Sequence, residues 1–199
     1  MSDLRHLRTG RLALDAVVPS DLEEHFAILS DPGVWRHLPA NVHTDRERTA
    51  EGIARQVECW ERTGLGMWTV RLRPDLPDDR VPPGLAPGAV VGMGGCAVPV
   101  DAAWWNLYYR LTPPAWGHGL AAELVAEAMA AAGQVDPGLP VVAYLLEHNR
   151  ESKGRAERSG LTLVWRGPDA GNPDPEAVRL VYADRPVDDE TLARIAARP

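Results

Sequence analysis

The chain has 199 residues, of which 45% are hydrophobic and 25% are charged, and its formal net charge is −7. This balance indicates one globular domain over 1–199 and argues against a broad basic face for nucleic acid. The two cysteines form neither a disulfide framework nor a zinc-ligand pattern, and no apolar run has the length of a membrane span or a signal core. We therefore expect a cytoplasmic protein without a metal, membrane or nucleic-acid partner.

The first part of the chain has the pattern of a strand followed by two helices. Alternating apolar residues predict a strand at 11–17, and a helix is expected over 19–31. A capping box formed by Thr44 and Glu47 predicts the start of a second helix, which should end near Gly64.

The middle of the chain is expected to form a strand, a loop and a hairpin. The strand at 66–73 is followed by segment 74–88, whose five prolines are incompatible with a strand or a helix. We interpret this segment as a surface loop within the domain. Strands at 89–100, which three glycines interrupt, and at 102–112, which is rich in aromatic residues, should pair as a hairpin.

The last part of the chain alternates between helices and strands. The predicted elements are a helix at 117–135, a central strand at 139–146, a helix at 150–159, strands at 161–165 and 177–182, and a short C-terminal helix at 188–197. The continuous apolar run of the central strand indicates that both of its faces are covered. Together these elements predict a mixed α/β sheet domain.

Two glycines one residue apart, Gly117 and Gly119, lead from a predicted strand into the clearest predicted helix. Glycine lets a ligand approach the backbone, and the first amides of a helix lack partners and favour an anion such as pyrophosphate. The alternative is a strand-to-helix turn in which the glycines serve geometry alone. The segment is neither a P-loop nor a dinucleotide fingerprint, because the Gly-Lys-Ser/Thr ending and a third glycine are missing.

Four segments of the chain carry a resemblance to a known family. They are Thr9-Gly-Arg-Leu-Ala-Leu14 with Asp21, Leu29-Ser-Asp-Pro-Gly-Val34 with Arg36 and Leu38, Pro114-Ala-Trp-Gly-His-Gly-Leu-Ala-Ala-Glu123, and Asn149-x-x-Ser152 with Ala156-Glu-Arg-Ser-Gly-Leu161. In this order they resemble the GNAT superfamily of acetyl-CoA-dependent N-acetyltransferases, specifically its RimJ/RimL-like branch, over residues 9–182. The resemblance implies a mostly antiparallel central sheet of six to seven strands, flanked by helices, with two strands splayed apart at the cofactor cleft.

The resemblance also implies which residues meet acetyl-CoA, the co-substrate. The pyrophosphate would meet the backbone amides of Trp116, Gly117, His118, Gly119, Leu120 and Ala121. Backbone groups of Tyr109, Arg110 and Leu111 would meet the pantetheine arm, and Asn149 and Ser152 would lie near its thiol end.

The sequence departs from the family where the acid and the base are expected. Ala156 replaces the usual acid tyrosine, and Asn106 stands where the family often carries a glutamate. Ser152 is either the acid that protonates the thiolate or the cap of its helix. Glu147 and His148, which follow the central strand, are the candidate bases.

Other polar residues are interpreted as structural. Glu123 matches a family position, and we expect its role on the helix to be structural. His25, His37 and His43 show no metal-ligand spacing and are assigned to packing or to the surface. Arg155 stands at a position that is usually apolar in the family, and the sequence suggests no role for it.

The sequence therefore predicts an acetyl-CoA-dependent N-acetyltransferase in which a neutral primary amine attacks the thioester directly. The acceptor would be a protein N-terminus or a small-molecule amine. An acidic chain would suit a cationic acceptor, but net charge is too blunt to decide this. The alternative is a GNAT-fold module that binds acyl-CoA or a partner without catalysis. A homodimer is left open.

Overall fold

One sheet organises the computed structural model, which describes residues 3–198. Its eight strands lie in the order β1-β2-β3-β4-β5-β6-β8-β7. They are β1 His6–Arg8, β2 Leu12–Ala16, β3 Met67–Leu72, β4 Val90–Ala97, β5 Trp105–Leu111, β6 Val141–Leu146, β7 Thr162–Pro168 and β8 Val178–Ala183. Neighbouring strands are antiparallel except β5 and β6, which run parallel.

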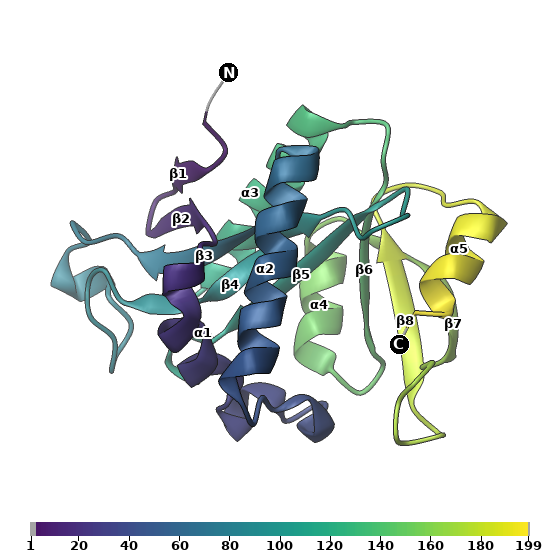
Figure 1. The fold of residues 1–199 in the computed structure, drawn as a ribbon, viewed down its shortest axis with the longest axis horizontal. Helices are drawn as coiled ribbons and strands as arrows, with labels where there is room; N and C mark the ends of the chain where they lie inside the picture. The colour runs from purple at the N-terminus through teal and green to yellow at the C-terminus, as the bar shows by residue number, and fades with distance from the viewer. Residues whose placement is uncertain (1–2, 199) are drawn as a thin grey trace.

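Helices cover both faces of this sheet. They are α1 Leu22–Leu29, α2 Arg46–Thr63, α3 Leu120–Val135, α4 Arg150–Arg158 and α5 Asp189–Ala196. In Figure 1, α1 and α2 lie in front of the sheet and α3 lies behind it. Strand β4 contacts both layers, because Met93 packs with Leu29 and Trp35 on the α1 side, whereas Gly94 lies against Leu124 of α3.

The predicted mixed, mostly antiparallel sheet with flanking helices is confirmed. It has more strands than the six to seven expected, because the three-residue β1 pairs with β2 and is too short to leave a sequence pattern. Segment 74–88 is a loop, as predicted, with one 3-10 turn at Asp78–Arg80. The C-terminal helix begins after Asp188, whose side chain caps it by accepting from the Thr191 amide.

The predicted capping box at the start of α2 is wrong. The cap is Asp45 rather than Thr44, and its carboxylate accepts a hydrogen bond from the Arg48 amide at 2.9 Å. Aspartate is among the strongest N-cap residues, so the helix starts one residue later than expected. Glu47 then lies in the first turn, where its negative charge favours the helix dipole.

The glycines that were expected to interrupt a strand lie inside the continuous strand β4. A Cβ atom at Gly92 would lie 2.1 Å from the carbonyl oxygen of Arg110, and one at Gly94 would lie 2.7 Å from Leu124 Cδ2. These glycines therefore let β5 and α3 approach β4 more closely than any side chain would allow.

Membrane-spanning helices, metal-ligand clusters and cysteines are considered next for residues 3–198. Among residues 3–198, no helix has the length and apolar character needed to cross a bilayer. In the same described part of the chain, no three His, Cys, Asp or Glu side chains gather as metal ligands would. Cys59 and Cys96 are buried free thiols.

Replacing Gly92 by alanine should destabilise the fold, because the new methyl group overlaps a backbone oxygen that cannot move without breaking the β4–β5 ladder. We expect the free energy of unfolding to fall by about 2 kcal/mol or more, measured by urea denaturation. The control is Gly133→Ala in α3, where nothing lies within 4 Å of the new Cβ. That change should add about 0.5–1 kcal/mol. Equal urea midpoints for Gly92→Ala and the unsubstituted protein would contradict this account.

Candidate active site

The turn between β5 and α3 presents a row of free backbone amides. Gly117 and Gly119 have left-handed φ angles of +79° and +77°, so α3 begins at Leu120 rather than at the predicted residue 117. Within residues 3–198, the amides of residues 117–121 donate to no backbone or side-chain acceptor. Residues 116–119 are exposed. Successive free amides at a helix N-terminus form an anion-binding arrangement.

Glu123 fastens this turn to the segment before β2. Its carboxylate accepts from the Thr9 hydroxyl, from the Arg11 amide at 2.6 Å and from Arg11 Nε at 2.8 Å. The Arg11 guanidinium also donates to the His118 carbonyl at 2.5 Å. Burial raises the pKa of Glu123, but the hydrogen bonds from Thr9 and Arg11 lower it more, so the net pKa lies below its ordinary value. The structural role expected of Glu123 is thereby confirmed.

Strands β5 and β6 separate soon after they meet. They share two residue pairs, the second of which joins Asn106 to Val142. Beyond this pair β5 stays hydrogen-bonded to β4, and β6 stays bonded to β8. The predicted splayed strands are therefore present. Residues 143–145 are only half-buried, because β5 no longer covers that edge of the central strand.

A small cavity of about 60 Å³ lies where the strands separate, on the side of α3 and α4. We call it the α3–α4 cavity. Strand β5 contributes Leu107 and Tyr109, β6 contributes Ala143, Tyr144 and Leu145, α3 contributes Val125, and Ser152, Arg155, Ala156 and Ser159 come from α4 and its C-terminal end. Arg155, to which the sequence assigned no role, thus places a positive charge at this cavity.

A larger cavity of about 260 Å³ lies on the side of α1 and α2. We call it the α1–α2 cavity. It is lined by His25, Leu29, Trp35, His43, Arg48, Thr49, Gly52, Ile53, Arg55, Gln56, Met67, Met93, Asn106 and Tyr108. The lining therefore comes from two helices, the segment between them and strands β3, β4 and β5.

Strand β5 reaches both cavities. Asn106 and Tyr108 line the α1–α2 cavity, whereas Leu107 and Tyr109 line the α3–α4 cavity. Successive side chains of a strand point to opposite faces of the sheet, so this alternation follows from the strand geometry. The two cavities therefore lie against opposite faces of β5 at the point where β6 diverges from it.

Ser152 is a neighbour of Tyr109. The helix cap is Asn149, whose Oδ1 accepts from the Ser152 amide at 3.2 Å, so the capping role considered for the Ser152 side chain is wrong. The Ser152 side chain instead lines the α3–α4 cavity together with Tyr109. Burial raises the pKa of Tyr109. The neighbouring Ser152 and the charges of nearby arginines lower this pKa, but by less. A tyrosine from β5 therefore lines the same cavity as Ala156, the α4 residue that replaces the tyrosine usual in the family.

The other residues expected to meet the co-substrate lie around the same turn. The Arg110 guanidinium stacks on the Trp35 ring at 3.6 Å, so its side chain lies on the α1–α2 side. Trp116 is exposed, and its Nε1 donates to the Leu111 carbonyl at 2.8 Å. Leu120 is buried in the core, which leaves only its amide for a ligand.

Glu147 and His148 are held by neighbours outside both cavities. The Glu147 carboxylate pairs with Arg166 at 2.7 Å, and this hydrogen bond lowers the pKa of Glu147. His148 Nε2 lies 2.8 Å from the His37 carbonyl oxygen and therefore donates to it. Their assignment as bases stays a prediction.

His25 belongs to a buried hydrogen-bonded chain. The Thr69 hydroxyl donates to Asp21 at 2.6 Å, so its oxygen accepts from His25 Nε2 at 3.0 Å. This arrangement leaves His25 Nδ1 without a proton, and Nδ1 is buried with no hydrogen-bond partner in the described part of the chain. Burial lowers the pKa of His25 more than the Asp21 charge raises it. The sequence assigned His25 to packing and missed its place on the cavity wall.

The sequence also missed the cavity-facing residues of α2. Arg48, Thr49, Gly52, Arg55 and Gln56 follow one another at about the helical repeat and line the α1–α2 cavity. Gly52 was the one available signal in the sequence. Glycine inside a helix costs about 1 kcal/mol relative to alanine, so it often has a packing or functional reason.

Comparison with known proteins gives the family. The model of the "Acetyltransferase (GNAT) domain" family matches residues 11–162, which is most of the chain. The chain belongs to the GNAT acetyltransferase family. It is therefore an N-acetyltransferase, and acetyl-CoA is the acetyl donor of this family.

Solved structures share the fold of this GNAT enzyme. An acetyltransferase from Agrobacterium tumefaciens matches with a TM-score of 0.69 and 24% identity, over 91% of this chain and 94% of that one. RimL, a ribosomal L7/L12 α-N-protein acetyltransferase solved with coenzyme A, matches with a TM-score of 0.68 and 18% identity, over 88% and 94%. The Salmonella typhimurium enzyme that modifies the N-terminal serine of L7/L12 matches with a TM-score of 0.67 and 16% identity, over 90% and 97%.

Replacing Glu123 by glutamine should loosen the amide turn, because the substitution removes the charge that pairs with Arg11. We expect the free energy of unfolding at pH 7 to fall by about 1.5–3 kcal/mol, measured by urea denaturation. The control is Glu23→Gln, whose pair with Arg46 is exposed and screened by solvent, so this substitution should lower the free energy of unfolding much less.

The same variant has a signed pH dependence. The folded-state pKa of Glu123 is lowered, so its contribution is complete above the unfolded value of 4.5 and is lost as the pH falls through the folded value. The difference between the unsubstituted protein and Glu123→Gln should therefore shrink below about pH 4.5. A difference that grows with acidification would contradict this assignment.

Proposed function

We propose that this GNAT enzyme transfers an acetyl group from acetyl-CoA, bound on the α3–α4 side, to a primary amine that enters through the α1–α2 cavity. The observation that carries the proposal is the alternation of β5, whose side chains line both cavities where β6 diverges. A donor and an acceptor bound on opposite faces of β5 would meet through that gap. Holding the two reactants together in this way is the main contribution of such a site.

The residues of the amide turn fit the pyrophosphate of acetyl-CoA. The amides of residues 117–121 have no hydrogen-bond acceptor in the described part of the chain, residues 117–119 are exposed, and the N-terminal end of α3 favours negative charge. The edge of β5 over Tyr109 and Arg110 has lost its β6 partner and is available to the pantetheine arm. We place Asn149 and Ser152 near the thiol end, on the α4 wall.

Acetyl-CoA supplies the thioester, whose carbonyl carbon bonds to the amine nitrogen while the carbon–sulfur bond breaks. Two protons have to move: one leaves the amine, and one reaches the thiolate. Ser152 donates the second and is reprotonated from solvent. Ser152 and Tyr109, which line the same cavity, take the place of the tyrosine that Ala156 replaces.

His25 accepts the amine proton. Its Nδ1 has no partner, its ring lines the α1–α2 cavity, and burial keeps it neutral at pH 7. The chain Asp21–Thr69–His25 fixes the tautomer that leaves Nδ1 free and stabilises the imidazolium that forms. Glu147 and His148 are the competing candidates from the sequence, and the variants below separate them.

We place the enzyme in the RimJ/RimL-like branch and in the cytoplasm. The sequence segments 9–14, 114–123 and 149–161 support the branch, and two buried free thiols suit a reducing compartment. The acceptor is a primary amine on a protein N-terminus or on a small molecule.

Acetyl-CoA binding should depend on the amide turn. Gly117→Asp puts a carboxylate and a strained left-handed residue among the amides, and we expect the affinity for acetyl-CoA to fall at least about 100-fold by calorimetry. Gly84→Asp is a matched control, because Gly84 has a similar φ of +82° and nothing lies near either Cβ position. Equal affinity in the two variants, or no binding by the unsubstituted protein, would refute the proposed co-substrate site.

His25→Gln should lower kcat about 100-fold with acetyl-CoA affinity unchanged, measured as thiol release from saturating amine. The unsubstituted enzyme should keep full kcat below pH 6.5, because the lowered pKa leaves His25 unprotonated there; kcat should then fall at lower pH. His148→Gln and Glu147→Gln are the comparison variants and should retain kcat. A large loss in either of them, with kcat retained in a folded His25→Gln, would move the base to that residue.

A further inference from the structure

We propose that the amine acceptor carries a carboxylate or a phosphate, and that Arg48 and Arg55 of α2 bind this anionic group in the α1–α2 cavity. The inference rests on the proposed acetyl transfer and names the substrate class of that site. The acceptor so described differs from the cationic acceptor that the net charge of the whole chain would suit.

The lining of the α1–α2 cavity has the opposite charge balance from the whole protein. The chain as a whole has a net charge of −7. The cavity lining contains Arg48, Arg55, His25 and His43, and it contains no aspartate or glutamate. A bound ligand responds to the charges within about a Debye length, so the local lining outweighs the net charge.

Arg48 has no anionic partner in the described part of the chain. Its guanidinium reaches only neutral oxygens, the Val42 carbonyl and Asn41 Oδ1, each at 3.4 Å. Its backbone amide is the group that Asp45 caps. The Arg48 charge is therefore available to a ligand.

Arg55 is similarly uncommitted and leans over the cavity wall. Among residues 3–198 its one ion pair is a loose i,i+4 contact with Glu51 at 3.9 Å, in which both side chains are more than 60% exposed. Such exposed pairs contribute little. A Cβ atom on Gly52 would lie 3.9 Å from the Arg55 terminal nitrogen, so the guanidinium lies over the glycine that opens the cavity.

Arg110 and His43 lie close enough to Arg48 and Arg55 for the four groups to share one electrostatic environment. Arg110 stacks on Trp35 and donates to the Tyr108 hydroxyl at 2.7 Å, which adds a third guanidinium beside the cavity. Burial lowers the pKa of His43, and Arg48, Arg110 and Arg55 lower it further against the opposing charge of Asp45. The field inside the cavity is therefore positive.

Two carboxylates near the cavity already have partners. Asp21 pairs with Arg71 at 2.7 Å and accepts from Thr69, and Asp45 caps α2. An anion from outside would therefore supply the missing counter-charge. Arg48 and Arg55 are seven positions apart, about 10 Å along the helix axis. Both line the α2 wall of the cavity, whereas Asn106 and Tyr108 line it from β5, so we place the anionic group at the α2 wall and the amine at the β5 wall.

The experiment compares pairs of amines that differ only in the anionic group. O-phosphoethanolamine with ethanolamine tests phosphate, and β-alanine with β-alanine amide tests carboxylate, each followed as thiol release from acetyl-CoA. We expect the anionic member to have at least about a tenfold higher kcat/KM. The preferred pair identifies which anion the site binds.

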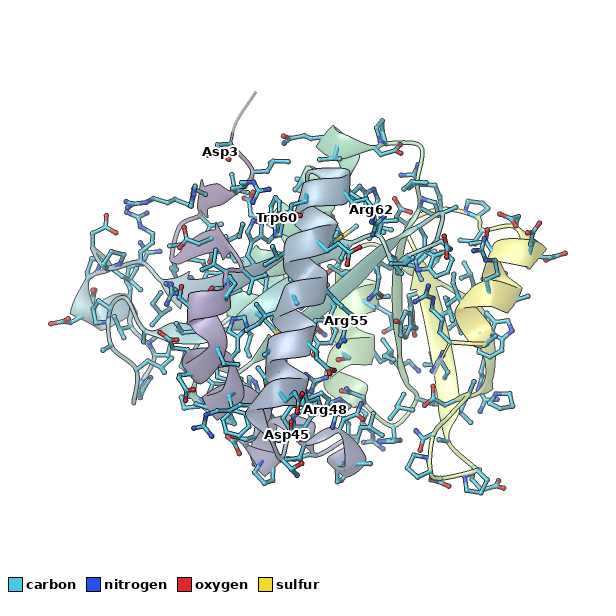
Figure 2. All side chains as sticks on the ribbon, in the orientation of Figure 1. Asp3, Asp45, Arg48, Arg55, Trp60 and Arg62 are labelled. Carbon is cyan, nitrogen blue, oxygen red and sulfur yellow. The ribbon has the colours of Figure 1, made fainter. Side chains whose placement is uncertain are left out.

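The variant is Arg48→Gln/Arg55→Gln, and its control is Arg46→Gln/Arg62→Gln, which removes the same charge from the same helix outside the cavity lining. Figure 2 shows Arg48 toward one end of α2, Arg55 near its middle and Arg62 toward the other end. The variant should raise KM for the anionic member about tenfold and leave kcat and acetyl-CoA affinity unchanged. The control should leave all three unchanged.

A second experiment, which does not depend on turnover, measures the pKa of His43 by NMR. Inorganic phosphate should raise this pKa in the unsubstituted enzyme and leave it unchanged in Arg48→Gln/Arg55→Gln. Thiol release that is equal or faster with the neutral amines, or a phosphate response that survives in the variant, would overturn the inference and leave the proposed function standing. Failure to bind acetyl-CoA would instead overturn the proposed function, and this inference with it.

Discussion

The parallel pairing of β5 with β6 stops at Asn106 and Val142, and the rest of the site depends on that limit. Antiparallel ladders to β4 and to β8 fix the two strands on their outer sides, so the gap between them cannot close by a simple shift. The gap leaves one edge of β5 without a partner and exposes both faces of the strand. Without it, the α1–α2 and α3–α4 cavities would be separated by a continuous sheet.

The amide turn at the start of α3 and the α1–α2 cavity both favour anions on an acidic protein, and they do so for different physical reasons. At the start of α3 the charge is that of backbone dipoles, five free amides that Glu123 and Arg11 hold in place. In the α1–α2 cavity it comes from guanidinium groups on α2 that have few acidic partners. The net charge of the whole chain does not show where either positive site lies, so it is a poor guide to the acceptor.

Local motifs made part of the site predictable from the sequence. Gly117 and Gly119 belong to one strand-to-helix turn, and Asn149 and Ser152 lie within one turn of a short helix, so sequence spacing alone fixed their relation. Even there, Asn149 rather than Ser152 proved to be the cap, because the choice depends on backbone angles at the helix start.

The α1–α2 cavity could not be predicted in the same way, because its wall joins residues from α1, α2, β3, β4 and β5. His25 gained its environment from Thr69, which is 44 positions away along the chain. A lone histidine in an apolar helix pattern carries no sign of such a neighbour. The tertiary register of the sheet, rather than any motif, brings the pair together.

A crystal structure of the enzyme with coenzyme A tests the central claim most directly. The account predicts pyrophosphate oxygens on the amides of residues 117–121, and the sulfur in the gap beyond Asn106, with Ser152 on one side and the α1–α2 cavity open on the other. Coenzyme A bound elsewhere, or a sulfur separated from the α1–α2 cavity by closed sheet, would contradict it.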